Sequence, residues 1–138
     1  MNVNEITGAI IKAAMKVHSA LGPGLLESAY EACLLYELRK AGLKVEAQVP
    51  LPVVYEGVKI DVGYRLDLLV ENAVIVELKA VEAILPIHEA QLLSYLKLSG
   101  KEVGLLINFH VLHLRNGIKR MVNSSPPRSS ASSAVQCG

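Results

Sequence analysis

The stretch YRLDLLVENAVIVELK, residues 64–79, is the most informative part of this chain for its fold. Both of its halves are rich in Leu, Val and Ile, which is typical of strands buried on both faces of a sheet. Between the halves, Glu71-Asn72 is typical of a tight turn. The stretch therefore predicts two neighbouring strands, which flanking apolar residues extend to Val58–Val70 and Ala73–Ala80.

Three charged side chains, Asp67, Glu77 and Lys79, lie inside these apolar strands. A charge in a buried strand is costly unless it is paired, hydrogen-bonded or bound to a metal. A loop of three residues, 71–73, would place Asp67 directly opposite Glu77, and Lys79 would share a face with Glu77. A loop of two residues would instead place Asp67 opposite an apolar residue. The prediction of a common site is therefore a prediction of register.

Two carboxylates held side by side repel each other and attract a cation. Oxygen ligands of this kind suit Mg²⁺ or Mn²⁺. The alternative is a structural ion-pair network of Asp67, Glu77 and Lys79 on a solvated face, since charged residues are mostly exposed. The apolar setting of the whole set favours the metal site.

The rest of the chain predicts further helices and strands around these two. Segments with helical spacing of apolar residues and runs of β-branched residues give the order ααβββαββ, with a turn at Glu56-Gly57. This order predicts an α/β or α+β fold with a central mixed sheet flanked by helices. The expected helices are Asn4–Leu21, Leu25–Ala41 and Pro86–Gly100, and the further strands are Val45–Val54, Val103–Phe109 and Val111–Arg115.

The length and composition of the chain predict one domain, residues 1–123. A Ser- and Pro-rich tail, residues 124–138, follows it, and we expect this tail to be disordered. The formal charge of +1 argues against a protein that coats nucleic acid by bulk electrostatics. A hydrophobic share of 51% in so short a chain favours self-association into a homo-oligomer. Cys33 and Cys137 form neither a disulfide framework nor a zinc site. No signal peptide or membrane-spanning run is visible, which favours a cytoplasmic protein.

Three motifs resemble those of a known nuclease superfamily. Asp67 followed by Glu77-x-Lys79 is similar to the (D/E)…(D/E)xK signature of PD-(D/E)xK, or restriction-endonuclease-like, nucleases. GLLESAY, residues 24–30, resembles the GxxExxY motif of a family of small proteins in that superfamily, and QLLSY, residues 91–95, resembles the QxxxY motif of RecB-like members. The motifs occur in family order, so the chain is identified as a member of the GxxExxY family. Leu66 stands where the superfamily's name has proline, a position that is often replaced.

The resemblance implies a restriction-endonuclease-like core and a role for each motif residue. Asp67 and Glu77 would ligate the metal, with the Leu78 backbone carbonyl as a third ligand. Lys79 would hold or deprotonate the attacking water and offset charge in the transition state. Glu27 matches the helical acid that completes the metal site in many relatives. A solvated carboxylate favoured by the helix dipole is an equal alternative for Glu27.

Gln91 is the fifth residue of the catalytic set, and Tyr95, His88 and Tyr30 have supporting parts in this interpretation. Gln91 would help to orient the active site or the scissile strand. Tyr95 lies one helical turn later on the same face, where packing is its commoner role, and His88 lies one turn earlier. His88 could contact phosphate, although a surface histidine at a helix start is the simpler interpretation. Tyr30 is expected to pack its ring in the core.

The function predicted from the sequence is Mg²⁺- or Mn²⁺-dependent hydrolysis of nucleic acid, with DNA favoured over RNA by the resemblance alone. The alternative from another class is a nuclease-fold protein that acts as a self-assembling or interaction module without catalysis. A hydrolase of some other phosphate ester is a third possibility. Oligomeric size discriminates between the nuclease and the self-assembling module. A large polymer would favour self-assembly, whereas a monomer or dimer fits an enzyme.

Overall fold

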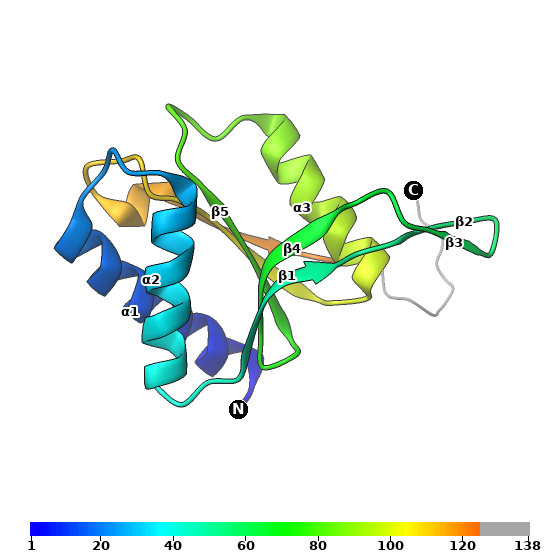
Figure 1. Ribbon diagram of the computed structural model, residues 1–138, viewed down its shortest axis with the longest axis horizontal. Coiled ribbons are helices and arrows are strands. Elements are labelled where there is room, and N and C mark those ends of the chain that lie inside the picture. Colours follow the sequence, from blue (N-terminus) through cyan, green and yellow to red (C-terminus); the bar gives the residue numbers. More distant parts are fainter. Residues whose placement is uncertain (125–138) are drawn as a thin grey trace.

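The computed structural model describes residues 1–124, in which two helices precede a mixed five-stranded sheet and a third helix (Figure 1). This α+β arrangement confirms the predicted fold class. The predicted tail, from residue 125 on, lies outside the described residues. The elements are α1 (Val3–Leu21), α2 (Glu27–Lys40), β1 (Val45–Pro50), β2 (Val53–Tyr55), β3 (Val58–Ile60), β4 (Arg65–Val70), β5 (Val74–Lys79), α3 (Pro86–Ser99), β6 (Val103–Asn108), a 3-10 helix (Leu114–Gly117) and β7 (Ile118–Val122).

The central sheet has the strand order β1-β4-β5-β6-β7. β5 and β6 are parallel, and the other neighbours are antiparallel. Parallel neighbours need a long crossover connection, and α3 supplies it between β5 and β6. β5 is therefore a central strand between β4 and β6, which is why it is almost entirely buried.

Two apolar cores lie on the two faces of the sheet. The first core packs α1 and α2 against the sheet, and the second core packs α3 against the other face. Along β5, Val74, Val76 and Leu78 belong to the first core and Ile75 to the second. Since strand residues alternate between faces, Glu77 faces the side of α3.

α1 begins with the cap that its sequence encodes. The Asn2 side chain accepts a hydrogen bond from the Glu5 backbone N–H, and the Glu5 carboxylate accepts one from the Asn2 backbone N–H, both at 2.9 Å. Such a capping box satisfies two N–H groups that have no partner in the first helical turn. Within residues 1–124, no helix combines the length and the apolarity needed to cross a membrane.

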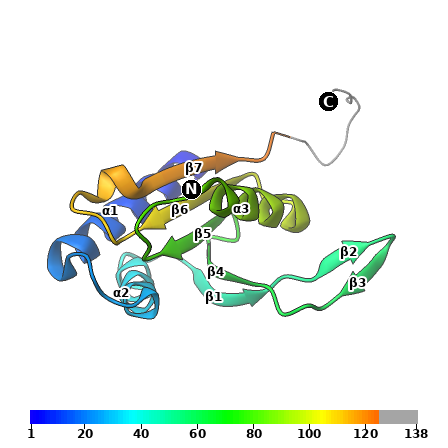
Figure 2. The ribbon, with the colours of Figure 1, turned by 90° about the horizontal axis from the view of Figure 1, so that it is seen from above.

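The predicted continuous strand Val45–Val54 is wrong, because the structure divides it into β1 and β2. The residues between and around them include Pro50 and Pro52, which have no N–H to donate to a neighbouring strand. β2 pairs instead with β3 across the predicted turn at Glu56-Gly57, where both residues have positive φ. The strand predicted at Val58–Val70 is divided in the same way, into β3 and β4. Figure 2 shows the β2–β3 hairpin, here called the arm, projecting from the sheet.

The predicted strand Val111–Arg115 is also wrong. This segment forms bends that lead into the 3-10 helix, and the strand that closes the sheet is β7. The apolar residues of the segment are used in a loop: Val111 packs against the first core and Leu114 is buried in it. Gly117 ends the loop, where a Cβ atom would lie 2.3 Å from the Asn108 carbonyl oxygen. The apolar residues of this segment resemble a strand in the sequence because the loop packs tightly against the core.

Candidate active site

Asp67 and Glu77 are brought opposite each other by the register of β4 and β5. Val70 pairs with Val74, and Leu68 pairs with Val76, so the loop between the strands has three residues, 71–73. This confirms the predicted register. Glu71 and Asn72 both adopt positive φ, 53° and 52°, as a tight hairpin connection requires.

Beyond the Leu68–Val76 pair, the two carboxylates hydrogen-bond to the backbone of the facing strands. Asp67 N–H donates to Glu77 Oε2 at 2.9 Å, and Leu78 N–H donates to Asp67 Oδ2 at 2.9 Å. Figure 1 shows β1 and β4 diverging from β5 on their way to the arm. The carboxylates therefore lie at a fork in the sheet, and each is fixed by a backbone donor.

Burial makes the charges of both groups costly. Glu77 is only 5% exposed, and loss of hydration together with the nearby Asp67 charge raises the pKa of Glu77 to about 8. The Asp67 N–H and the Lys79 charge oppose this rise. Burial is also the largest cause that raises the pKa of Asp67, against the Leu78 N–H and Lys79. Full ionisation of the pair therefore calls for more positive charge than the fold supplies.

Lys79 is the cation at this fork. It is half-buried at the end of β5, and the Phe109 backbone N–H donates to its carbonyl oxygen at 2.9 Å. Its charge lowers the pKa of Asp67, Glu77 and Glu27, which places its ammonium group near all three. The ion pairs within 4.0 Å among the described residues, Lys16–Glu37 and Lys119–Glu89, do not include it. The site is thus not a network of direct ion pairs.

Glu27 reaches this group from the start of α2. Loss of hydration is the largest cause that raises the pKa of Glu27, and the charges of Asp67 and Glu31 add to it. The position at the N-terminal end of a helix favours its negative charge. The structure therefore brings Glu27 into electrostatic contact with the paired carboxylates.

Tyr30 shapes the turn that presents Glu27. Its hydroxyl donates to the Gly22 carbonyl oxygen at 2.6 Å and accepts the Leu25 backbone N–H at 3.1 Å. Its ring is fully buried and stacks on Phe109, with ring centroids 4.5 Å apart. Tyr30 therefore packs in the core as expected, and its hydroxyl also closes the turn before α2.

The three predicted residues of α3 lie in different surroundings. Tyr95 is buried in the second core, and burial, followed by the Glu77 charge, raises its pKa. Gln91 is exposed on the same face of the helix. His88 Nδ1 accepts the Leu85 backbone N–H at 2.9 Å and so caps the start of α3.

Three residues beside the site were not predicted. Glu31 follows Glu27 by one helical turn, a spacing that could have indicated a shared face. Gln48 Nε2 donates to both carboxylate oxygens of Glu31, at 2.9 and 3.1 Å. The Tyr64 ring lies 5.8 Å from the Tyr95 ring, centroid to centroid. Nothing in the sequence around Gln48 indicates its contact with α2.

The donor set fits a hard divalent cation. Mg²⁺ is commonly held by one or two carboxylates together with water and substrate phosphate, and Asp67 and Glu77 are two such carboxylates with raised pKa values. Each uses one oxygen for a backbone hydrogen bond. Among residues 1–124, no group of three or more His, Cys, Asp or Glu side chains is close enough to hold a metal. Glu27 and the Leu78 carbonyl therefore stay predicted ligands.

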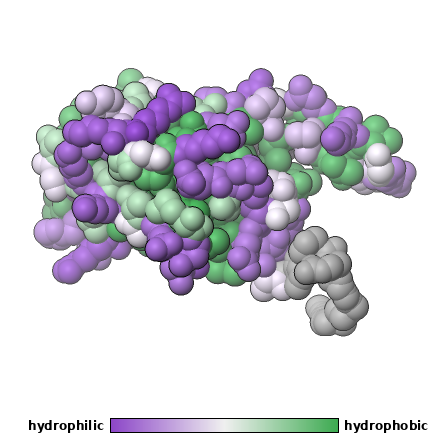
Figure 3. All heavy atoms as spheres, turned by 90° about the horizontal axis from the view of Figure 1, so that it is seen from below, coloured by the Kyte–Doolittle hydropathy of each residue, from purple (hydrophilic) through white to green (hydrophobic). Residues whose placement is uncertain are grey.

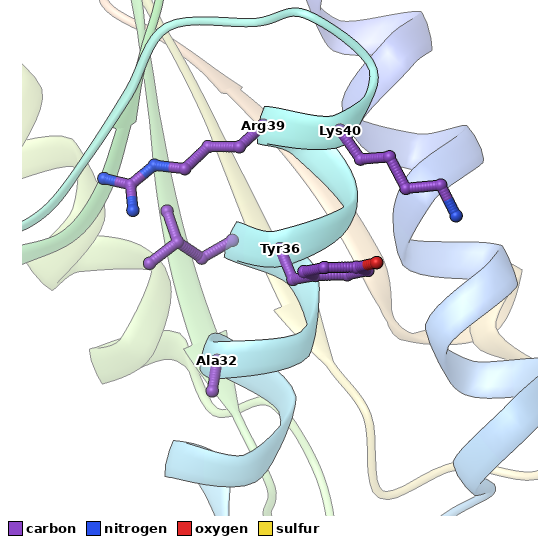
Figure 4. Close-up of a pocket in the computed structure, with 5 residues that line it drawn as sticks. Ala32, Tyr36, Arg39 and Lys40 are labelled. Carbon is purple, nitrogen blue, oxygen red and sulfur yellow. The ribbon is translucent and has the colours of Figure 1, made fainter.

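A shallow pocket of about 450 Å³ lies elsewhere, on the outer side of α2 (Figure 4). Arg39 and Lys40 extend to opposite sides of Tyr36, and the Lys40 ammonium lies 5.7 Å from the centre of the Tyr36 ring. None of the predicted site residues lines this pocket.

A model of the PD-(D/E)XK nuclease superfamily matches residues 4–121. The match spans the fork, α2 and α3, and so includes all of the predicted site residues. Comparison with curated proteins and with solved structures found no match.

Proposed function

The chain belongs to the PD-(D/E)XK nuclease superfamily, and from this membership we propose that it is a metal-dependent nuclease. The observation that carries the proposal is the hydrogen-bonded placement of Asp67 and Glu77 opposite each other in apolar strands, with Lys79 beside them. If the site had lost its chemistry, nothing would favour keeping Asp67, Glu77 and Lys79 in apolar strands, where their charges destabilise the fold.

Asp67 and Glu77 would hold Mg²⁺ or Mn²⁺, with the Leu78 carbonyl and Glu27 completing the ligand set. A bound divalent ion polarises a phosphate and lowers the pKa of water. The raised pKa values of Asp67 and Glu77 support this role, because a cation would relieve their repulsion and their loss of hydration.

Lys79 would orient the attacking water and offset the negative charge of the transition state. The water oxygen forms a new bond to phosphorus, the ester P–O bond breaks, and the leaving sugar oxygen takes a proton. Lys79 suits these tasks because it is held at the end of β5 near three carboxylates and forms no direct ion pair within the described residues. Gln91 would help to orient the active site or the scissile strand from α3, and the buried Tyr95 would support this helix by packing.

We also assign the chain to the GxxExxY family within this superfamily. Each motif residue has a part in one local structure: Gly24 has a φ of 101°, Tyr30 closes the turn, and Glu27 begins α2 beside the fork. DNA is the favoured substrate by the resemblance alone. A near-neutral chain has little bulk attraction for phosphate, so selectivity would come from a partner, dimerisation or DNA structure.

Self-association is the second candidate function, and the arm is the observation that favours it. Tyr55, Val58 and Ile60 share one face of the arm with Val53 and are 63%, 58% and 40% exposed. Figure 3 shows apolar side chains at the surface of the arm. A short two-stranded hairpin is marginal in water by itself, so a homo-oligomer that covers this face would stabilise it. Light scattering of wild type beside Val58→Lys decides whether the arm mediates association.

The test of the nuclease proposal is Mg²⁺ and Mn²⁺ titration by calorimetry, with cleavage of plasmid and oligonucleotide substrates by the same samples. Asp67→Asn and Glu77→Gln preserve shape and remove charge, and Glu46→Gln, an exposed acid of β1, is the matched control. We expect wild type and the control to bind metal and cleave, and both site variants to lose at least about 100-fold in cleavage. A wild-type protein that binds neither ion and cleaves nothing would remove the proposal.

A further inference from the structure

Gln48 has an unusual backbone conformation for a residue within a strand. Its φ is 54°, in the left-handed region that residues with a side chain seldom adopt. The usual exceptions are Gly, Asn and Asp, and Gln has no comparable local hydrogen bond to offer. Such strain destabilises the fold and persists only where surrounding contacts maintain it.

The strain falls opposite Asp67. On its two sides, Ala47 pairs with Leu68 and Val49 pairs with Leu66, so the register is the same before and after it. No residue is inserted, and the distortion is therefore not a bulge. β1 and β4 nevertheless rotate about their long axes at this point. The Ala47–Leu68 pair packs in the first core, on one face of the sheet, whereas the Val49–Leu66 pair packs in the second core, on the other face.

The side chain of Gln48 supplies contacts that maintain this conformation. Its amide donates to both oxygens of Glu31, at 2.9 and 3.1 Å, and thereby connects β1 to α2. Glu31 lies one helical turn after Glu27, so the connection fixes the segment of α2 that carries both acids. The register of β1 and β4 places Gln48 opposite Asp67, so this link to α2 is made beside the paired carboxylates.

We propose that Gln48 is a positioning residue of the active site, which acts through Asp67 and is anchored by Glu31. The proposal rests on the proposed nuclease function. From its position opposite Asp67, Gln48 holds α2 against the fork and keeps β1 fixed beside the strand whose Asp67 Oδ2 accepts the Leu78 N–H. The strained φ is the structural cost of aiming the amide at Glu31 from the position opposite Asp67.

Gln48→Gly separates positioning from folding. Glycine adopts positive φ without strain, which offsets the loss of the Gln48 contacts, so the urea midpoint of unfolding should stay close to that of wild type. In metal-free protein with EDTA, we expect hydrogen exchange at the Leu78 amide to become at least about 10-fold faster while that of the core amides of β6 is unchanged. The Mg²⁺ dissociation constant should rise by about 10- to 100-fold, as for other residues that orient metal ligands.

The matched control is Glu46→Ala, an exposed residue two positions earlier on β1, which should change neither quantity. In a double-mutant cycle with Glu31→Ala, the effects of Gln48→Gly on Leu78 exchange should be non-additive, since the two residues act as one unit. Unchanged Leu78 exchange in Gln48→Gly overturns the proposal, and so does a general acceleration of exchange with a lower free energy of unfolding. The exchange measurement needs no metal, so it decides the role of Gln48 even where wild type binds no Mg²⁺ and the nuclease function fails.

Discussion

The Asp67 backbone N–H donates to the Glu77 carboxylate, and the Asp67 carboxylate in turn accepts the backbone N–H of Leu78, the residue after Glu77. The two acids therefore fix each other's strands as well as facing each other. A substitution that keeps the acceptor oxygen preserves this arrangement, whereas truncation to alanine removes a strand contact. Amide variants are for that reason the sharper probes of charge at this site.

Glu77→Gln should remove much of a pH dependence of stability in the metal-free protein. The pKa of folded Glu77 is about 8, above its ordinary value of 4.5, so the folded state holds the proton through the interval between these values. The contribution of Glu77 to stability is therefore present below the lower value and is lost as the pH rises through the upper one. Since one pKa unit corresponds to about 1.4 kcal/mol, the variant should gain at least that much relative to wild type at high pH.

The measurement is urea unfolding in EDTA at about pH 5 and about pH 8.5 for both proteins. If the two proteins lose stability in parallel between these pH values, Glu77 does not carry the buried proton.

Divalent metal should stabilise wild type and leave Asp67→Asn unaffected. A ligand present at 100 times its dissociation constant stabilises the folded state by about 2.7 kcal/mol. The amide introduced by Asp67→Asn retains an oxygen that can accept the Leu78 N–H, so the variant should fold normally in EDTA. Thermal unfolding with Mg²⁺, with Ca²⁺ and with EDTA checks this. Equal Mg²⁺-induced shifts in both proteins would show that Asp67 is not a ligand.

Tyr30→Phe should loosen the turn before α2 and weaken metal binding. The variant keeps the ring stacked on Phe109 but loses the hydrogen bonds to Gly22 and Leu25. Leaving those backbone groups without the hydroxyl costs about 1–3 kcal/mol. The control is Tyr36→Phe, an exposed tyrosine of the same helix, which should lose almost nothing. Chemical unfolding and Mg²⁺ titration of both variants test the prediction, and similar losses in the two would contradict it.

The register of the site could be predicted because it depends on local sequence. The alternation of strand residues and the length of the 71–73 loop together place Asp67 opposite Glu77, whatever the rest of the fold does. The arm and the last strand depend on long-range pairing. Apolar runs at Val45–Val54 and Val111–Arg115 resemble strands, but prolines in the first and loop packing in the second override the pattern.

The part played by Gln48 could not be predicted for a different reason. A positive φ at a residue other than glycine leaves no mark on the sequence, and it arises only where β1, β4 and α2 meet. Glu31 was in reach of prediction from its spacing to Glu27, but the acceptor role of its carboxylate depends on Gln48.

Lys79 should affect the chemical step more than metal binding. Lys79→Met keeps the length and apolar stem of the side chain and removes the charge that lowers the pKa values of Asp67 and Glu77. Cleavage should fall by about 100- to 1,000-fold, the usual loss when one group that stabilises transition-state charge is removed. Lys79→Arg restores charge but not the compact ammonium geometry, so it should recover only part of the rate. Single-turnover cleavage and Mg²⁺ calorimetry on the same preparations separate the two effects, with Lys119→Met on the exposed strand β7 as the control. A Lys79→Met protein that cleaves at the wild-type rate would remove Lys79 from the chemistry and leave it as a counter-charge for the paired acids.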